Sequence, residues 1–330
     1  MLACFKLDKL YRKLIYYIYK STKSNSVAIK VYTIQIAENA FDVAPDNSNL
    51  YFCEETAIDL RIYQISTTNG TVVNAYQRPE LYVNGIGSFI TVSEDSTSVH
   101  ISGYKDTEKQ YYWRWNISSI EIQWIQLFKN TPGILPGGTQ TTSKFSYATG
   151  ITAISHDVVY LTLEMNGLNF TEILSINFGS SWNYVQWASR VTWQGQCYSL
   201  LSKLLFDSSN QKLFVAIFAD EKFMFFTLDS ADGSMVSGSG IFYTNILWDE
   251  GSVHKMHLRD DKVYIPAHCK ESTLFVYDIT NDSFDNVYIA NDNTVHTFTD
   301  VYFLDTQIYF SGSSYDWIVF DGNSWTSEYP

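Results

Sequence analysis

Short stretches of alternating apolar and polar residues, separated by polar turns, recur along most of the chain. Such period-two alternation predicts β-strands with one buried face. Six of the stretches carry a common triplet, made of an apolar residue, a ring-bearing residue and a second apolar residue. The triplets are Leu50-Tyr51-Phe52, Val99-His100-Ile101, Val159-Tyr160-Leu161, Leu213-Phe214-Val215, Val263-Tyr264-Ile265 and Ile308-Tyr309-Phe310. They begin 45 to 60 residues apart, and each follows a polar turn.

Two more strand-like segments follow each triplet, and the residues between them are typical of hairpin turns. These turns read Thr-Thr-Asn-Gly at 67–70, Ser-Ala-Asp-Gly at 230–233 and Asp-Gly-Asn at 321–323. Each repeat therefore predicts four antiparallel strands in meander order. The six full units span about 39–77, 86–128, 146–193, 197–244, 250–290 and 295–330.

A repeat of this length predicts an all-β propeller built from four-stranded antiparallel blades. A single four-stranded sheet cannot bury both of its faces, whereas packing each sheet against its neighbours around a ring does so. A β-sandwich is the alternative, because its strands alternate in the same way. The regular four-strand unit favours the propeller, with residues 39–330 as one domain.

Residues 1–38 form either a partial blade or an N-terminal extension. Two strand-like segments within 14–36 parallel the two outer strands of a full unit. This half-unit favours seven blades with one incomplete, and six blades plus an N-terminal hairpin is the alternative. It also favours a true start upstream of residue 1. The apolar positions between Leu7 and Ile18 fit one face of a helix as well, so a membrane-surface helix is a third interpretation.

The segment from Phe41 to Phe52 reads FDVAPDNSNLYF and resembles the YVTN or lactonase-type propeller repeat. In that repeat an apolar strand enters an Ala/Ser-Pro-Asp turn and leaves it on Leu-Tyr. Here Pro45 fixes φ in the turn, and Asp46 can accept backbone hydrogen bonds. The later units lack the Pro-Asp pair, so the resemblance implies a propeller fold and assigns no activity.

Composition narrows the class of protein. The 330 residues carry a formal net charge of -13, which argues against a nucleic-acid partner. Apolar residues make up 45%, so a disordered chain is excluded. No apolar run reaches about 18 residues, so no transmembrane segment is expected. The 4 cysteines form no CxxC pair, which argues against a zinc or thioredoxin-like site.

Three histidines are candidate residues of the central channel. His254 and His257 lie in the VHKMHL segment, which we expect to be an innermost strand, and His296 precedes the corresponding strand of the last unit. A general-base or metal role would suit them. However, residues three apart on a strand point to opposite faces, so His254 and His257 do not make one ligand pair. We therefore assign no catalytic, metal-binding or cofactor-binding residue.

Acidic turns offer calcium the oxygen ligands that it prefers. The best candidates are Asp229 with Asp232, and Asp278 with Asn281 and Asp282, although ordinary hairpin turns explain both. Four N-glycosylation sequons begin at Asn69, Asn116, Asn169 and Asn281, and Asn69, Asn116 and Asn281 fall at hairpins between outer strands. Residues 129–144 hold two prolines and three glycines, which predicts a long loop that could contact a partner.

The absence of any catalytic motif favours a non-enzymatic binding or assembly module. We expect a scaffold for protein partners, glycans or self-assembly, without a required cofactor. Low charge and abundant Ser, Thr, Asn and Tyr favour an extracellular or cell-surface setting. One alternative is a propeller hydrolase or lactonase-like enzyme with its site at the central channel. Another is a cytoplasmic complex subunit whose acidic surface meets basic partners.

Overall fold

The computed structural model of the chain describes most of the predicted strands and many of their turns. The described residues are 2–8, 13–22, 25–35, 41–46, 48–55, 60–66, 71–78, 84–106, 109–119, 121–126, 146–165, 170–177, 184–192, 201–219, 222–236, 242–244, 252–253, 256–268, 272–289, 298–304, 307–312, 317–320 and 325–328. Within them every regular element is a β-strand. No helix in this part of the chain has the length and apolar character needed to cross a bilayer.

The strands of the first half of the chain form four antiparallel sheets. The first sheet holds β1 (Leu2–Asp8), β2 (Lys13–Thr22) and β3 (Asn25–Gln35). The second holds β4 (Phe41–Val43), β5 (Asn49–Glu55), β6 (Leu60–Ser66) and β7 (Val72–Arg78). The third holds β8 (Asn84–Val92), β9 (Ser98–Asp106), β10 (Lys109–Asn116) and β11 (Glu121–Gln126). The fourth holds β12 (Ser146–Ala153), β13 (Val158–Met165), β14 (Phe170–Asn177) and β15 (Tyr184–Thr192).

The second half of the chain adds three more antiparallel sheets. One holds β16 (Leu201–Asp207), β17 (Lys212–Ala219), β18 (Lys222–Asp229) and β19 (Phe242–Thr244). The next holds β20 (Ser252–Val253), β21 (His257–Arg259), β22 (Lys262–His268), β23 (Ser272–Asp278) and β24 (Ser283–Ile289). The last holds β25 (Phe298–Leu304), β26 (Gln307–Gly312), β27 (Trp317–Phe320) and β28 (Trp325–Glu328).

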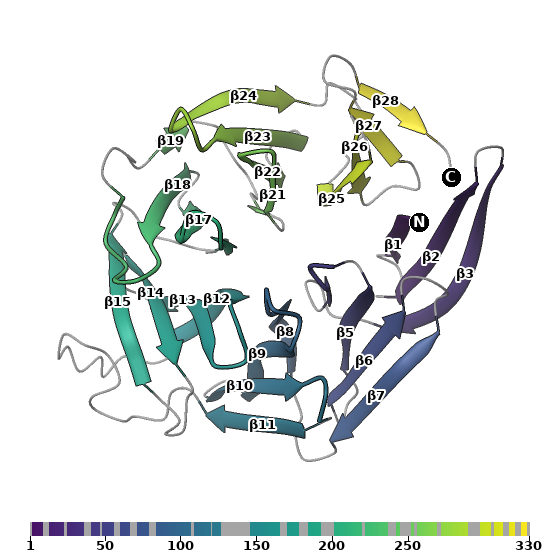
Figure 1. The fold of residues 1–330 in the computed structure, drawn as a ribbon, viewed down its shortest axis with the longest axis horizontal. Coiled ribbons are helices and arrows are strands. Elements are labelled where there is room, and N and C mark those ends of the chain that lie inside the picture. Colours follow the sequence, from purple (N-terminus) through teal and green to yellow (C-terminus); the bar gives the residue numbers. More distant parts are fainter. Residues whose placement is uncertain are drawn as a thin grey trace.

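The sheets are arranged around a common centre, with early strands of each sheet on the inside and the last strand outside (Figure 1). Each sheet contacts the next along the chain, through pairs such as β4 with β8, β12 with β16, and β22 with β25. The ends of the chain close this circle, because β1 contacts β26 and β3 contacts β5. This arrangement is the ring packing that the repeat predicts.

Each of the six triplets lies in the second strand of a different sheet, as predicted. The flanking apolar residues are fully buried wherever the structure describes them, for example Leu50, Val159 and Val263, each 0% exposed. In β17, Leu213 belongs to a core with the preceding sheet, whereas Phe214 belongs to a core with the following sheet. Because side chains alternate between the two faces of a strand, one triplet packs against both neighbouring sheets.

One irregularity recurs between third and fourth strands. The register of β6 with β7, of β14 with β15 and of β23 with β24 shifts near the same end of the pair. The shifts fall at Gln64/Ile65, Ser175/Ile176 and Val276/Tyr277, just before each third strand ends. A β-bulge adds twist to the outer strand at the hairpin. Its repetition indicates that the units share local geometry as well as strand order.

The structure departs from the sequence analysis at two places. The N-terminal hairpin of β2 and β3 forms, so the membrane-surface helix is wrong for this segment, and β1 pairs with β2 as an additional strand. In the sixth sheet the expected innermost strand is broken into β20 and β21, which both pair with β22. His254 and residue 255, between β20 and β21, lie outside the described residues, so the expected alternation from His254 to His257 stays a prediction.

Candidate interaction face and buried polar seam

Of the three predicted channel histidines, only His257 lies among the described residues. His257 lies in β21, half-buried, opposite Tyr264 of β22. His254 and His296 lie outside the described residues. Among described side chains, no group of three His, Cys, Asp or Glu residues is placed to hold a metal ion.

The carboxylates that we considered as calcium ligands cap their own turns. Asp229 Oδ1 accepts a hydrogen bond from the Ala231 N–H at 2.8 Å, and Asp232 Oδ1 accepts one from the Ser234 N–H at 2.8 Å. Asp278 Oδ1 accepts from the N–H groups of residues 280 and 281 at 2.8 and 2.9 Å. The Tyr277 hydroxyl donates to Asp282. These bonds are those of ordinary Asx turns, and calcium binding remains a prediction.

Two of the four sequons fall on described residues, Asn116 at the end of β10 and Asn281 in the turn before β24. Asn281 is exposed, and its Nδ2 donates to Asp278 Oδ2 at 3.1 Å. Asn116 is half-buried, and its Oδ1 accepts from the N–H groups of Ser118 and Ser119 at 3.0 and 3.1 Å. Asn69, Asn169 and the loop 129–144 lie outside the described residues.

Turns from several sheets share one face of the ring. In an antiparallel meander the first–second and third–fourth turns lie at the same end of the sheet. Backbone bonds tie these turns together within a sheet and between sheets. The Ser230 N–H donates to the Gln211 carbonyl at 3.1 Å, and the Glu94 N–H of one sheet donates to the Ala153 carbonyl of the next at 3.1 Å. We call this side the acidic face, for the residues given below.

Carboxylates dominate the described turns of the acidic face. The exposed ones are Asp46, Glu94, Asp95, Asp157, Asp229, Asp232, Asp260 and Asp261, and two half-buried ones are Asp278 and Asp282. The basic residues of the same turns are Lys212, Arg259 and Lys262, all half-buried. The face is therefore strongly negative, in keeping with the net charge of -13.

Turn hydrogen bonds keep several of these carboxylates ionised. Bonds from Ser48 lower the pKa of Asp46, and bonds from Ser234 lower that of Asp232. The Asn281 and Thr280 N–H groups lower the pKa of Asp278. Hydrogen bonds to the charged form favour it, so the negative charge is both permanent at neutral pH and fixed in position.

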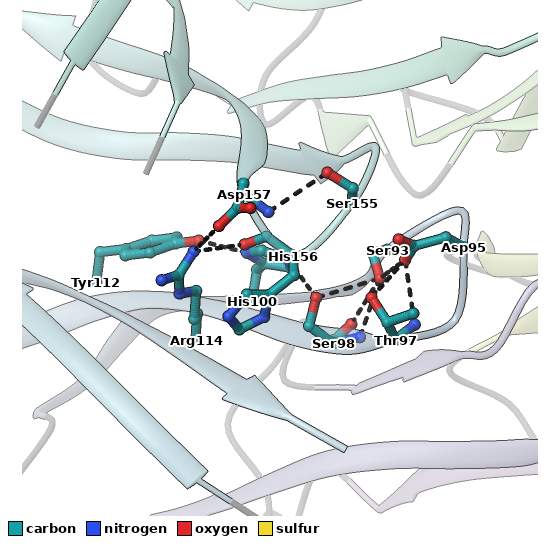
Figure 2. Close-up of polar contacts among 10 residues, drawn as sticks. All are labelled: Ser93, Asp95, Thr97, Ser98, His100, Tyr112, Arg114, Ser155, His156 and Asp157. Carbon is teal, nitrogen blue, oxygen red and sulfur yellow. Dashed lines mark hydrogen bonds and ion pairs between the residues drawn. The ribbon is translucent and has the colours of Figure 1, made fainter. Parts of the chain in front are cut away.

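A second polar feature lies inside the ring, on β9. Ser98, His100 and Ser102 point to one face of this strand, and all three are 0% exposed. His100 Nε2 is 3.0 Å from Ser98 Oγ, and its Nδ1 is hydrogen-bonded to the Tyr112 hydroxyl of β10 (Figure 2). Burial lowers the pKa of His100 from 6.5 to about 3, and the charges of His156 and Arg114 add to the shift. His100 is thus a neutral, buried imidazole.

The network reaches the surface in two directions (Figure 2). From Ser98 it passes to Ser93, whose hydroxyl donates to Asp95 Oδ1 at 2.6 Å. From the neighbouring strand, Arg114 Nη1 donates to Asp157 Oδ1 at 2.6 Å and to the His156 carbonyl at 2.9 Å. Arg114 is buried and Asp157 is half-exposed, so this ion pair joins the interior to the acidic face.

This network was not predicted from the sequence, where His100 is only the middle residue of one triplet. The available signal was that one triplet carries imidazole where the others carry Tyr or Phe. Arg114, between Trp113 and Trp115, was a second signal, because a charged residue inside an aromatic strand needs a partner.

Comparison with known proteins identifies the fold. No family model and no curated protein sequence matches the chain. An uncharacterized protein from Listeria monocytogenes EGD-e is similar in structure, with a TM-score of 0.55 and 10% identity over 96% of this chain and 91% of that one. The dihydro-heme d1 dehydrogenase NirN has a TM-score of 0.55 and 11% identity, covering 96% of this chain and 60% of its own.

The β-propeller domain of the Trilobed protease from Pyrococcus furiosus is a third similar structure. Its TM-score is 0.50 with 12% identity, over 99% of this chain and 98% of that one. At such identities the likeness shows the fold alone. The chain is an all-β propeller of antiparallel sheets, and the YVTN-type resemblance of residues 41–52 remains a prediction.

Proposed function

We propose that the chain is a seven-bladed propeller that serves as a non-enzymatic binding module for proteins. The circle of contacts from β1 to β26 and from β3 to β5 supports seven blades. In this arrangement the three-stranded β1–β3 sheet is the incomplete blade, at the closure of the ring.

The acidic face is the observation that carries the binding function. It gathers carboxylates from successive sheets onto one side of a rigid ring, and their turns hold them in place. Fixed charges of one sign recognise a complementary partner and speed its association, and they lose no side-chain freedom on binding. The partner that fits this surface is a protein segment rich in Lys and Arg.

Binding of a basic peptide tests the proposal. The probe is a fluorescent peptide of alternating Lys and Ser, with a Glu-Ser peptide as the charge control, measured by anisotropy at low and high NaCl. We expect the basic peptide alone to bind, and more weakly at high salt, because exposed charges are screened. The double variant D260N/D261N should weaken binding about fivefold, at roughly 0.5 kcal/mol for each exposed charge.

The D260N/D261N substitutions should disturb the fold little. Asp260 and Asp261 are exposed and have φ of 51° and 57°, a left-handed conformation that Asn also accepts. The matched control is E54Q/E55Q, since Glu54 and Glu55 lie at the end of β5 away from the acidic face. Equal loss in both variants, or no peptide binding at all, would contradict the proposal. Ester or lactone hydrolysis that depends on His254 or His296 would favour the enzyme instead.

A further inference from the structure

The described seams between neighbouring sheets differ in chemistry. The seam between the β12–β15 and β16–β19 sheets holds a large apolar cluster that includes Ile173, Phe206 and Leu213, beside the buried hydroxyl pair of Thr162 and Ser202. The next seam is more aromatic still, with the Phe223 and Phe275 rings stacked at 4.5 Å. These two seams gain stability from burying apolar surface, which they would expose on opening.

The seam between the β8–β11 and β12–β15 sheets, here the polar seam, is built differently. The β9 side presents Ser98, His100 and Ser102, and each is fully buried. On the β13 side, Tyr160 belongs to the opposite seam, so Val159 and Leu161 face β9. Aliphatic side chains offer no hydrogen bond, and the Ser102 hydroxyl has no hydrogen-bond partner among the described residues.

Opening the polar seam would expose these polar groups together with the buried ring of Tyr112. Water would hydrate the hydroxyls and the imidazole that the seam now buries, whereas it cannot repay the loss of an apolar contact. Among the described residues, the links that cross the seam include the Arg114–Asp157 ion pair and the bond from Arg114 Nη1 to the His156 carbonyl at 2.9 Å. They also include the backbone bonds from the Glu94 and Asp95 N–H groups to the carbonyls of residues 153 and 154, at 3.1 and 3.4 Å.

We propose that the propeller opens at the polar seam when the protein is acidified. His100 is neutral in the closed seam and gains its usual proton affinity when the seam exposes it to water. The sign follows from linkage: the closed state is fully stabilised above pH 6.5 and loses stability as the pH falls from 6.5 toward 3. The proton is thus taken up by the open state.

The charged groups around His100 come from each packed element. Arg114 of β10 and His156 of the 154–157 turn oppose its protonation, whereas Asp95 of the 93–97 turn favours it. Asp157 pairs with Arg114 and reduces the positive charge beside the imidazole. Burial opposes ionisation of Asp95, but hydrogen bonds from Ser93 and Thr97 outweigh it and lower the pKa of this carboxyl, so Asp95 stays ionised between pH 7.5 and 5. Histidine titration therefore governs this pH range.

A buried thiol can report the opening directly. The background has its four native cysteines replaced by Ser. In it, S102C places a thiol in the polar seam, and V215C places one in the seam between the β12–β15 and β16–β19 sheets. The labelling rate of each folded protein is divided by the rate of the same thiol in urea at each pH, which removes the pH dependence of the reagent. We expect labelling at position 102 to rise about 30-fold from pH 7.5 to 5, and labelling at position 215 to stay constant.

Two further variants assign the effect to His100. H100Q keeps a polar, neutral side chain and should abolish the pH dependence at position 102, whereas H257Q, at the half-buried histidine of β21, should leave it intact. The proposal is overturned if both thiols respond equally, which would mean global unfolding, or if H100Q still responds to pH. A measurement that needs no substitution is amide exchange of Glu94 and Asp95, corrected for intrinsic rates. It should accelerate at pH 5, and constant protection would overturn the proposal.

Discussion

Replacing Gly150 by Ala should destabilise the ring through lack of space. Gly150 lies in β12, and a Cβ atom there would be 2.8 Å from Thr162 Oγ1 and 2.9 Å from the carbonyl oxygen of Ser202. Thr162 could rotate away, but the Ser202 oxygen is backbone of β16, an inner strand of the next sheet. The two inner strands must therefore separate locally to admit one methyl group.

The magnitude follows from two costs. Overpacking a tight site costs about 1–3 kcal/mol. Separation of the strands also strains the hydrogen bond between Thr162 Oγ1 and Ser202 Oγ, now 2.5 Å long, which adds about 1 kcal/mol. A total of about 2–4 kcal/mol should lower Tm by roughly 3–6 °C in a domain of this size.

Urea and thermal unfolding of wild type, G150A, T162A and G150A/T162A measure this effect. T162A removes the hydroxyl that the new Cβ would meet, but not the Ser202 carbonyl oxygen. The double variant should therefore be less destabilised than the sum of the two single variants. A G150A protein as stable as wild type, or more stable, would refute the steric argument, because only relief of chain entropy would then remain.

Two further predictions concern the polar seam and the ring closure. S102A should raise Tm by about 1–2 °C, because it removes a fully buried hydroxyl without a described partner, worth about 1 kcal/mol. A lower Tm in a differential scanning experiment would show that the hydroxyl is satisfied. Deletion of residues 1–38 should lower Tm markedly, because it removes the contacts of β1 with β26 and of β3 with β5 and leaves the two neighbouring sheets without a packing partner on one face. An unchanged melting curve would exclude a role in closure.

The architecture could be predicted because it repeats. Each triplet lies in a second strand, and such a strand is buried on both faces in β9, β13 and β17, as Leu213 and Phe214 illustrate. The sequence analysis failed where a unit departs from the repeat. β1 has no triplet, and the break between β20 and β21 falls within a segment whose apolar pattern is continuous enough for one strand.

Contacts between sheets could not be predicted from the pattern within one sheet. In the sequence, Gly150 indicates only an interruption of a strand. The need for glycine there comes from the close approach of the β16 backbone, which leaves no space for a Cβ atom. His100 and Arg114 lie 14 residues apart in sequence, but the residues that meet Arg114, His156 and Asp157, belong to the next unit. Pairing of this kind depends on the packing of two separate repeats, which local alternation does not encode.

The positions of the sequons bring two expectations into conflict: glycosylation of a secreted protein, and binding of a basic partner by the acidic face. Asn116, at the end of β10, and Asn281, in the turn before β24, lie on the acidic face, and Asn281 Nδ2 contacts the carboxylate of Asp278 directly. A glycan at Asn281 would cover that carboxylate and keep a basic partner from the turn. A glycosylated, secreted form could therefore bind a basic partner only through turns without a sequon, such as 93–97, 154–157 and 260–261. Because D260N/D261N alters one of those turns, its effect on binding should persist in both forms.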